Sequence, residues 1–238
     1  MAIPSGNIKY WYDTSDPASY PGSGLVVYDL SGNGNDVTFN ACTFQDPRKV
    51  LALSRNDFGQ LDSSDIPSGN AVYTFEIWQK RDSATAGSPG FDAIFGVGYT
   101  GSNDRIINNT DSPPGTTALT VRTATGPSDI NGTFNTGWNH WVFLYDGTNG
   151  KIYLNGVLAD SVVTGGQSNG IARDTDGQNI ACFNGLFYAA GPVGGGATQR
   201  FPGMIGEWGY FRIYDTALTA GQVLDQFNAN YARFYPGE

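Results

Sequence analysis

The alternation of apolar and polar positions is clearest between Trp138 and Val163. Residues 138–145 read Trp-Asn-His-Trp-Val-Phe-Leu-Tyr, so that both alternating faces are largely apolar, which is typical of a strand buried on both sides. Turn residues follow at 146–150, and the Asn155-Gly156 dipeptide favours a two-residue turn with positive φ at both positions. The segment therefore predicts three consecutive antiparallel strands, 138–145, 151–154 and 157–163, with the first in the middle of a sheet.

Shorter apolar runs recur along the rest of the chain, separated by stretches rich in turn residues. The 238 residues include 33 Gly and 12 Pro, which indicates many short strands joined by turns. We find no internal repeat and no linker, so we expect residues 1–238 to form a single domain. The further strand-like runs are Leu25–Asp29, Val50–Leu53, Val72–Lys80, Phe91–Val97, Ala118–Thr123 and Met204–Tyr214.

One segment near the C-terminus predicts a helix instead. Residues 219–230 begin with Thr219 and carry Gln222 three positions later, which is the spacing of a capping box. We expect the apolar stripe of this helix to pack on an edge of the sandwich. The stripe consists of Val223, Leu224 and Phe227.

The charge balance excludes some classes of partner. Lys and Arg number 13 against 22 Asp and Glu, which gives a net charge of −9 and a sequence pI near 4.4. Nucleic-acid binding depends on basic side chains that displace counterions from phosphates, and the basic residues here form no cluster. No apolar run reaches the roughly 18 residues that cross a bilayer. We therefore expect no nucleic-acid partner and no insertion into a membrane.

The two cysteines, Cys42 and Cys182, each lie in apolar surroundings. They are expected either as buried free thiols or as one disulfide, and both alternatives stay open. The chain has no histidine near either cysteine, so the sequence offers no zinc site.

Three groups of residues resemble one known family. The first is the loop Tyr28–Asp36, which contains Asp-Leu-Ser-Gly-Asn-Gly-Asn, and the last is Gly206–Leu218 with the helix that follows it. Between them come the segments Phe75–Trp78, Trp138–Val142 and Tyr153–Gly156. In this order, and over nearly the whole chain, they resemble the laminin-G-like, or concanavalin A-like lectin/glucanase, superfamily.

The resemblance implies an all-β fold: a two-sheet antiparallel jelly-roll sandwich of the concanavalin A type, with one short C-terminal α-helix. It does not decide the function, because this superfamily includes lectins, adhesion modules, glycosidases and virus structural proteins. Short members without an export signal resemble proteins of tailed-phage virions, such as capsid decorations, fibres and tail adhesins.

Carboxylates suited to glycoside hydrolysis are sparse. Glycosidases of the superfamily place two or three acids at alternating positions of one strand, and retaining chemistry needs two carboxyls about 5 Å apart. Glu76 and Glu207 each stand alone on a predicted strand, and we expect both at an edge or facing solvent. His140 is the only histidine, and its place in the predicted central strand indicates a core or hydrogen-bonded role. These observations indicate a protein that is not an enzyme.

The loop after Tyr28 has the oxygen ligands that a hard cation prefers. Calcium takes about six to eight oxygens, but this loop lacks the length and the bidentate Glu of an EF-hand. A tight turn held by Asx hydrogen bonds is the alternative interpretation. No other cofactor is required by the sequence. The candidate calcium ligands are Asp29, Asn33, Asn35 and Asp36.

Carbohydrate binding would require an aromatic face that stacks on a sugar ring beside polar groups that bind its hydroxyls. Loops on a rigid scaffold often carry such sites, and four polar stretches here are longer than a hairpin turn. They are residues 82–89, 108–117, 164–178 and 189–199. The aromatic candidates in or beside loops are Tyr99, Tyr188, Phe91 and Trp208.

Two functions follow as hypotheses. The first is a non-catalytic structural or interaction module of a phage virion, which binds other virion proteins or copies of itself as a homo-oligomer and contacts a host or environmental glycan. Residues 1–6 lack the pattern of a signal peptide, so such a protein would be made in the host cytoplasm and leave in the virion. The alternative is a stand-alone lectin-like protein that binds a cell-surface glycan. A third alternative is a glycoside hydrolase.

Overall fold

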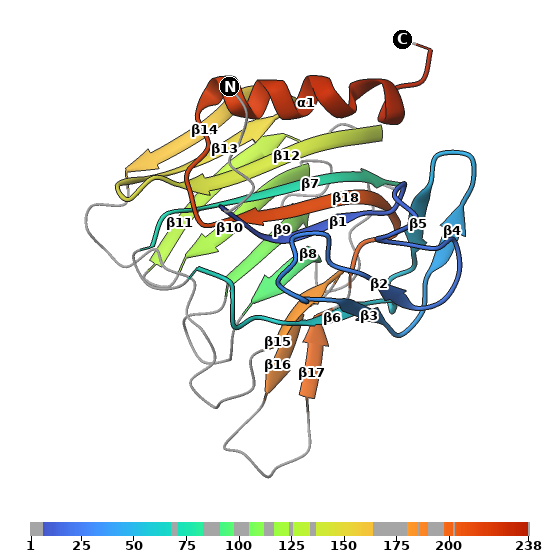
Figure 1. The fold of residues 1–238 in the computed structure, drawn as a ribbon. Coiled ribbons are helices and arrows are strands. Elements are labelled where there is room, and N and C mark those ends of the chain that lie inside the picture. The colour runs from blue at the N-terminus through green and yellow to red at the C-terminus, as the bar shows by residue number, and fades with distance from the viewer. Residues whose placement is uncertain are drawn as a thin grey trace.

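The fold is a two-layer β-sandwich with one helix, seen in a computed structural model (Figure 1). The structure describes residues 7–67, 71–82, 91–97, 105–111, 117–123, 126–133, 137–163, 180–184, 186–189, 198–201 and 203–237. Within these ranges every strand pairing is antiparallel, and the strands form two eight-stranded sheets and one small hairpin. The predicted jelly-roll sandwich of the concanavalin A type is confirmed.

The first sheet carries the helix on its outer face. Its strand order is β14-β13-β12-β7-β18-β5-β4, and β1 pairs with the C-terminal half of β18. The strands are β1 (Ile8–Asp13), β4 (Thr43–Gln45), β5 (Val50–Leu53), β7 (Tyr73–Arg81), β12 (Gly137–Tyr145), β13 (Asn149–Leu154), β14 (Val157–Val163) and β18 (Gly206–Tyr214).

The second sheet forms the other layer of the sandwich. The small hairpin lies beside β15 of this sheet and points away from the helix (Figure 1). Its strand order is β11-β10-β9-β8-β15-β6-β3-β2. The strands are β2 (Val26–Val27), β3 (Val37–Phe39), β6 (Gly59–Asp62), β8 (Phe91–Val97), β9 (Arg105–Asp111), β10 (Thr117–Thr123), β11 (Gly126–Thr133) and β15 (Ile180–Phe183), with β16 (Leu186–Ala189) and β17 (Thr198–Phe201) in the hairpin.

The predicted three-strand meander is confirmed as β12, β13 and β14. Strand β12 lies between β7 and β13, so it is central, as its two apolar faces indicated. Asn155 and Gly156 have φ values of 51° and 80°, so both residues of the tight turn are left-handed. The sequence between 108 and 117 is only partly a loop, because β9 continues to Asp111.

The main core lies between the two sheets and is rich in aromatic rings. Phe183 of β15 is at its centre, with its ring centroid 4.4 Å from Phe211 and 5.0 Å from Phe95. Tyr12 of β1 packs on the same ring at 5.7 Å. These contacts join strands from both sheets, so the rings hold the two layers together.

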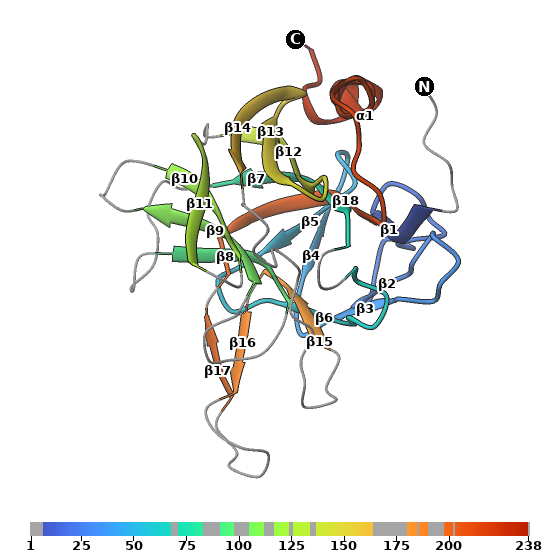
Figure 2. The ribbon, with the colours of Figure 1, turned by 90° about the vertical axis from the view of Figure 1, so that its left-hand side faces the viewer.

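Helix α1 (Ala220–Phe234) lies across the outer face of the first sheet, and Figure 2 shows it end-on above that sheet. Its Phe234 ring stacks on Trp78 of β7 at 4.5 Å, and Phe227 stacks on the same indole at 5.5 Å. The prediction that the helix packs on an edge is therefore wrong, because β7 and β12 present apolar rings on this face as well as toward the core. Leu224 of the predicted stripe is 45% exposed.

The capping box at the start of α1 is confirmed. The Thr219 hydroxyl accepts a hydrogen bond from the Gln222 amide, and the Gln222 side chain accepts one from the Thr219 amide. We expect Thr219→Ala to lower the free energy of unfolding by about 1 kcal/mol, because the Gln222 amide loses its hydrogen-bond acceptor. Urea denaturation measures this change. Asn228→Ala, on the exposed side of the same helix, is the control, and an equal effect of the two variants would contradict the prediction.

The two cysteines are not bonded to each other: Cys182 is buried and Cys42 is partly exposed. The free-thiol interpretation is therefore confirmed, although Cys42 is less buried than expected. In the part of the chain that the structure describes, no helix is long and apolar enough to cross a membrane.

Candidate functional site

The aromatic residues predicted to bind sugar do not form a described site. Tyr99 lies outside the described residues, and the side chains of Phe91 in β8 and Tyr188 in β16 do so as well. Trp208 of β18 is 2% exposed, and its ring stacks on Phe183 at 5.2 Å with an interplanar angle of 9°. The prediction that Trp208 contacts a sugar is wrong, because both layers of the sandwich cover its ring.

The loop between β2 and β3 brings the four candidate calcium ligands together as a hydrogen-bonded turn. Both oxygens of Asp29 accept protein hydrogen bonds, from the amides of Trp11 and Ser31 on one side and from the Ser31 hydroxyl and the Asn35 amide on the other. Asp36 accepts a hydrogen bond from the Asp29 amide at 2.8 Å.

The two asparagines of this loop point to β1. Asn33 Nδ2 donates to the Ile8 and Lys9 carbonyls, and Asn35 Nδ2 donates to the Lys9 carbonyl and to Asp65. The Asx turn of the alternative interpretation is formed by Asp29, whose Oδ1 accepts a hydrogen bond from the Ser31 amide two residues later. Calcium binding by this loop is untested, and a cation would have to displace protein donors from Asp29.

We expect the melting temperature to be the same in EDTA and in millimolar calcium, because the Asp29 oxygens are already satisfied by the protein. Differential scanning calorimetry in both buffers measures this. A rise of several degrees with calcium, lost in an Asp29→Asn variant, would show that the loop takes the cation.

The two isolated carboxylates do not form a hydrolytic pair. In the β7–β18 ladder Glu76 is opposite Arg212 and Glu207 is opposite Lys80, so four residues of β7 separate their positions. That separation is about 13 Å at roughly 3.3 Å per residue, too far for either glycosidase geometry. Glu207 is 7% exposed and binds Arg48 at 3.1 Å and Lys80 at 3.7 Å. Glu207 is therefore held in ion pairs with these two basic side chains.

Glu76 is completely buried under α1, so the expectation that it faces solvent is wrong. Its Oε1 lies 3.0 Å from His140 Nε2, and its Oε2 accepts a hydrogen bond of 2.6 Å from the Tyr214 hydroxyl. Burial alone would raise the pKa of Glu76, but His140, Arg212 and Tyr214 together lower this pKa below its ordinary value. His140 therefore has the hydrogen-bonded core role that the sequence indicated. This cluster is closed to substrate.

Arg212 connects the buried cluster to the surface between β1 and α1. Its Nη1 donates to the Tyr214 hydroxyl at 3.3 Å and to Gln226 Oε1 of the helix at 3.1 Å. The guanidinium lies over the Trp11 ring at 4.2 Å and over the Tyr210 ring at 4.7 Å. Burial alone would lower the pKa of Arg212, but Tyr210, Tyr214 and Glu76 together raise this pKa above its ordinary value. The side chain therefore stays cationic.

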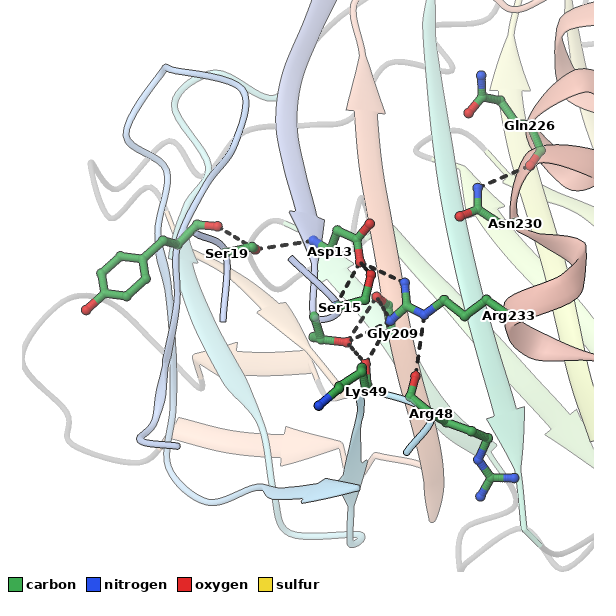
Figure 3. A network of polar contacts seen from close by, with 11 residues as sticks. Asp13, Ser15, Ser19, Arg48, Lys49, Gly209, Gln226, Asn230 and Arg233 are labelled. Carbon is green, nitrogen blue, oxygen red and sulfur yellow. Dashed lines mark hydrogen bonds and ion pairs between the residues drawn. The ribbon is translucent and has the colours of Figure 1, made fainter. Parts of the chain in front are cut away.

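A second network fixes the far end of the helix beside β1 (Figure 3). Arg233 Nη1 binds Asp13 at 2.7 Å, and Nη2 donates to the Lys49 carbonyl at 2.8 Å and to the Gly209 carbonyl at 3.1 Å. Asn230 lies one turn before Arg233 on the side facing the sheet and donates to the Gln226 carbonyl. The helix, β1 and β18 are thereby held as one rigid unit.

Trp11, Arg212, Gln226 and Asn230 thus form one partly exposed polar surface, which we call the β1–α1 surface. Sequence reasoning missed it. One signal was present in the sequence. Tyr210, Arg212 and Tyr214 occupy every second position of a predicted strand, so all three lie on the same face of it. The contact with Trp11 had no local signal, because it joins the two ends of the chain.

The profile of one family matches residues 53–224, and its description is the concanavalin A-like lectin/glucanases superfamily. The chain belongs to this superfamily. The matched segment covers most of both sheets and the start of α1. The resemblance to this family is therefore confirmed, whereas the likeness to phage virion proteins stays a prediction.

Solved structures with the same fold include binding domains of toxins and a module of a glycosidase. The binding domain of Paraclostridial Mosquitocidal Protein 1 matches 95% of this chain with a TM-score of 0.67 and 16% identity, over 53% of its own length. The binding domain of botulinum neurotoxin serotype D, solved with N-acetylneuraminic acid, matches 94% of this chain with a TM-score of 0.65 and 10% identity, over 51% of its length. Domain 4 of AbnA, a GH43 extracellular arabinanase from Geobacillus stearothermophilus, solved with arabinotriose, matches 92% of this chain with a TM-score of 0.61 and 20% identity, over 97% of its length.

At these identities the likeness shows the fold alone. The chain spans about half the length of the toxin binding domains that it matches. A search of curated proteins finds no matching sequence.

Proposed function

We propose that this chain is a non-catalytic, lectin-like module that binds a glycan. The observation that carries the proposal is the match of nearly the whole chain to domains solved with sugars, one with N-acetylneuraminic acid and one with arabinotriose. A folded β-sandwich suits such binding, because a preformed surface loses little entropy when a ligand arrives.

The surroundings of Glu76 and Glu207 support glycan binding rather than glycoside hydrolysis. Glu76 is sealed beneath α1 and Glu207 is held by Arg48 and Lys80, so neither is placed to act as acid or nucleophile on a sugar. Within the described ranges, no group of three or more His, Cys, Asp or Glu side chains is arranged to hold a metal ion.

A glycan array with the purified chain tests the proposal. We expect binding to at least one class of glycan, with competition by the free sugar. Binding to no glycan at millimolar sugar would contradict the function. Tyr99→Ala and Tyr188→Ala test the predicted loop residues, and Cys42→Ser is their control.

The placement of this module on a phage virion is a finer proposal, which rests on the resemblance described above. Glycan recognition and attachment to a particle are compatible, since an adhesin on a virion would need both. Mass spectrometry of purified virions from the producing host tests the placement. Absence of the chain from the particles would contradict it and would leave glycan binding intact.

A further inference from the structure

The outer face of the second sheet is exposed where β2, β3 and β6 lie side by side (Figure 1). Val27, Val37 and Leu61 of these strands are buried in the core between the sheets. Because side chains alternate along a strand, the residues next to them lie on the outer face. Five of these side chains are exposed, and we call their surface the β2–β6 face: Tyr28, Asp36, Thr38, Gln60 and Asp62.

The side chains of the β2–β6 face form a compact grid. Thr38 of β3 is opposite Gln60 of β6. Two residues further along this ladder Asp36 comes beside Asp62, and Tyr28 follows β2 at the neighbouring position. Neighbouring strands lie about 4.8 Å apart, and alternate residues of one strand lie about 6.7 Å apart. The hydroxyl groups of one sugar ring, or of two linked rings, are separated by similar distances.

Tyr28 is the only exposed aromatic ring in the part of the chain that the structure describes. Its side chain is 46% exposed, whereas the other aromatic side chains described there are buried or partly buried. The Tyr28 backbone is fixed by Ser19, because its amide donates to the Ser19 carbonyl at 2.7 Å and its carbonyl accepts from the Ser19 hydroxyl at 2.8 Å. An exposed ring at a fixed place beside polar groups is the arrangement on which a sugar ring stacks.

The two carboxylates of the face are held in place by backbone amides. Asp36 Oδ1 accepts a hydrogen bond of 2.8 Å from the Asp29 amide, and Asp62 Oδ1 accepts one of 2.7 Å from the Ser64 amide. Both side chains are nevertheless exposed, so they can also accept hydrogen bonds from sugar hydroxyls. Because their orientation is already fixed, binding through them costs little conformational entropy.

The charges of the face disfavour one class of sugar. Two of its five side chains are negative and none is basic. An acidic sugar would be repelled by these carboxylates, whereas a neutral sugar meets no opposing charge. The Thr38 hydroxyl and the Gln60 amide both donate and accept hydrogen bonds, as sugar hydroxyls do.

We propose that the β2–β6 face binds a neutral sugar. The sugar ring stacks on Tyr28, and its hydroxyls are bound by Asp36, Asp62 and Gln60. The inference rests on the proposed glycan-binding function and adds the place of contact and the class of sugar.

The test begins with wild type on an array of neutral and acidic glycans, with lactose, arabinotriose and sialyllactose among them. We expect binding to neutral glycans. Titration calorimetry with the neutral glycan that gives the strongest array signal then compares the variants. Tyr28→Ala and Asp62→Ala should each lower its affinity about tenfold or more, because each removes a direct contact.

Asp225→Ala is the matched control, since it removes an exposed carboxylate from α1 on the other layer of the sandwich. It should change the affinity less than twofold. All three substitutions replace exposed side chains, so melting temperatures close to that of wild type are expected.

A second measurement uses the wild-type protein and does not depend on how well a variant folds. In NMR spectra recorded while the same neutral glycan is added, the backbone amide resonances of Tyr28, Thr38 and Gln60 should be among those that shift most. Sialyllactose at the same concentration should shift them less.

Three results would overturn the inference while leaving the proposed function intact. They are binding of acidic glycans only, unchanged affinity in either Tyr28→Ala or Asp62→Ala, and amide shifts confined to residues outside the β2–β6 face. Binding to no glycan at all would overturn the proposed function itself, and this inference with it.

Discussion

Replacing Glu76 by alanine is expected to lower the free energy of unfolding by about 3–5 kcal/mol at pH 7. The carboxylate is completely buried, and its two oxygens hold the His140 imidazole and the Tyr214 hydroxyl. Without it, two buried polar groups lose their partner and Arg212 loses a negative charge that favours its cationic form. Urea denaturation followed by tryptophan fluorescence measures the change.

Glu207→Ala is the matched control, because Glu207 lies on the same face of the sheet in an ion pair with the partly exposed Arg48. We expect its effect to be clearly smaller.

The dependence of stability on pH gives a second check. The folded pKa of Glu76 is lowered, so its contribution is fully present above the ordinary pKa of a glutamate, about 4.3, and is lost as the pH falls through the folded value. The gap between wild type and Glu76→Gln should therefore narrow below about pH 4. A gap that is constant down to pH 3 would contradict the lowered pKa of Glu76 in the folded protein.

Trp78→Ala should cost about 3–5 kcal/mol and should loosen helix α1 in particular. The indole is buried between the helix and the sheet, where it stacks on Phe234 at 4.5 Å, on Phe227 at 5.5 Å and on His140 at 4.9 Å. Its removal leaves a cavity under the helix. Hydrogen exchange measured by mass spectrometry should show faster exchange in residues 220–234 than in β12.

Trp208→Ala provides the comparison, since that ring is equally buried but lies between the two sheets. A similar loss of stability is expected, with no selective exposure of the helix. Equal protection of residues 220–234 in both variants would show that Trp78 does not anchor α1.

The parts of the fold that could be predicted are those with local causes. The meander of β12, β13 and β14 follows from alternation and from the Asn155-Gly156 turn, and the start of α1 follows from Thr219 and Gln222. The position of the helix was predicted wrongly, because the helix packs on rings from β7 and β12, which lie far from it in the sequence. Short strands such as β2, with two residues, leave too little pattern to set their bounds.

The candidate site was harder to predict for the same reason. The Asp29–Asp36 loop has a local signature, and its residues indeed come together, although as a turn. Glu76 was expected at the surface because nothing near it in the sequence shows that His140, Tyr214 and a helix enclose it. Arg212 gains its importance only from Trp11 and Gln226, which β1 and α1 bring to it from distant parts of the chain.

If this jelly roll binds a glycan without cleaving it, as we propose, the bound glycan can be recovered unchanged. The most direct measurement incubates the purified chain with the glycan selected on an array, then determines both the bound fraction and the mass of the recovered sugar. We expect saturable binding and recovery of the whole glycan at its original mass. No binding, or recovery of shorter sugars with new reducing ends, would contradict it.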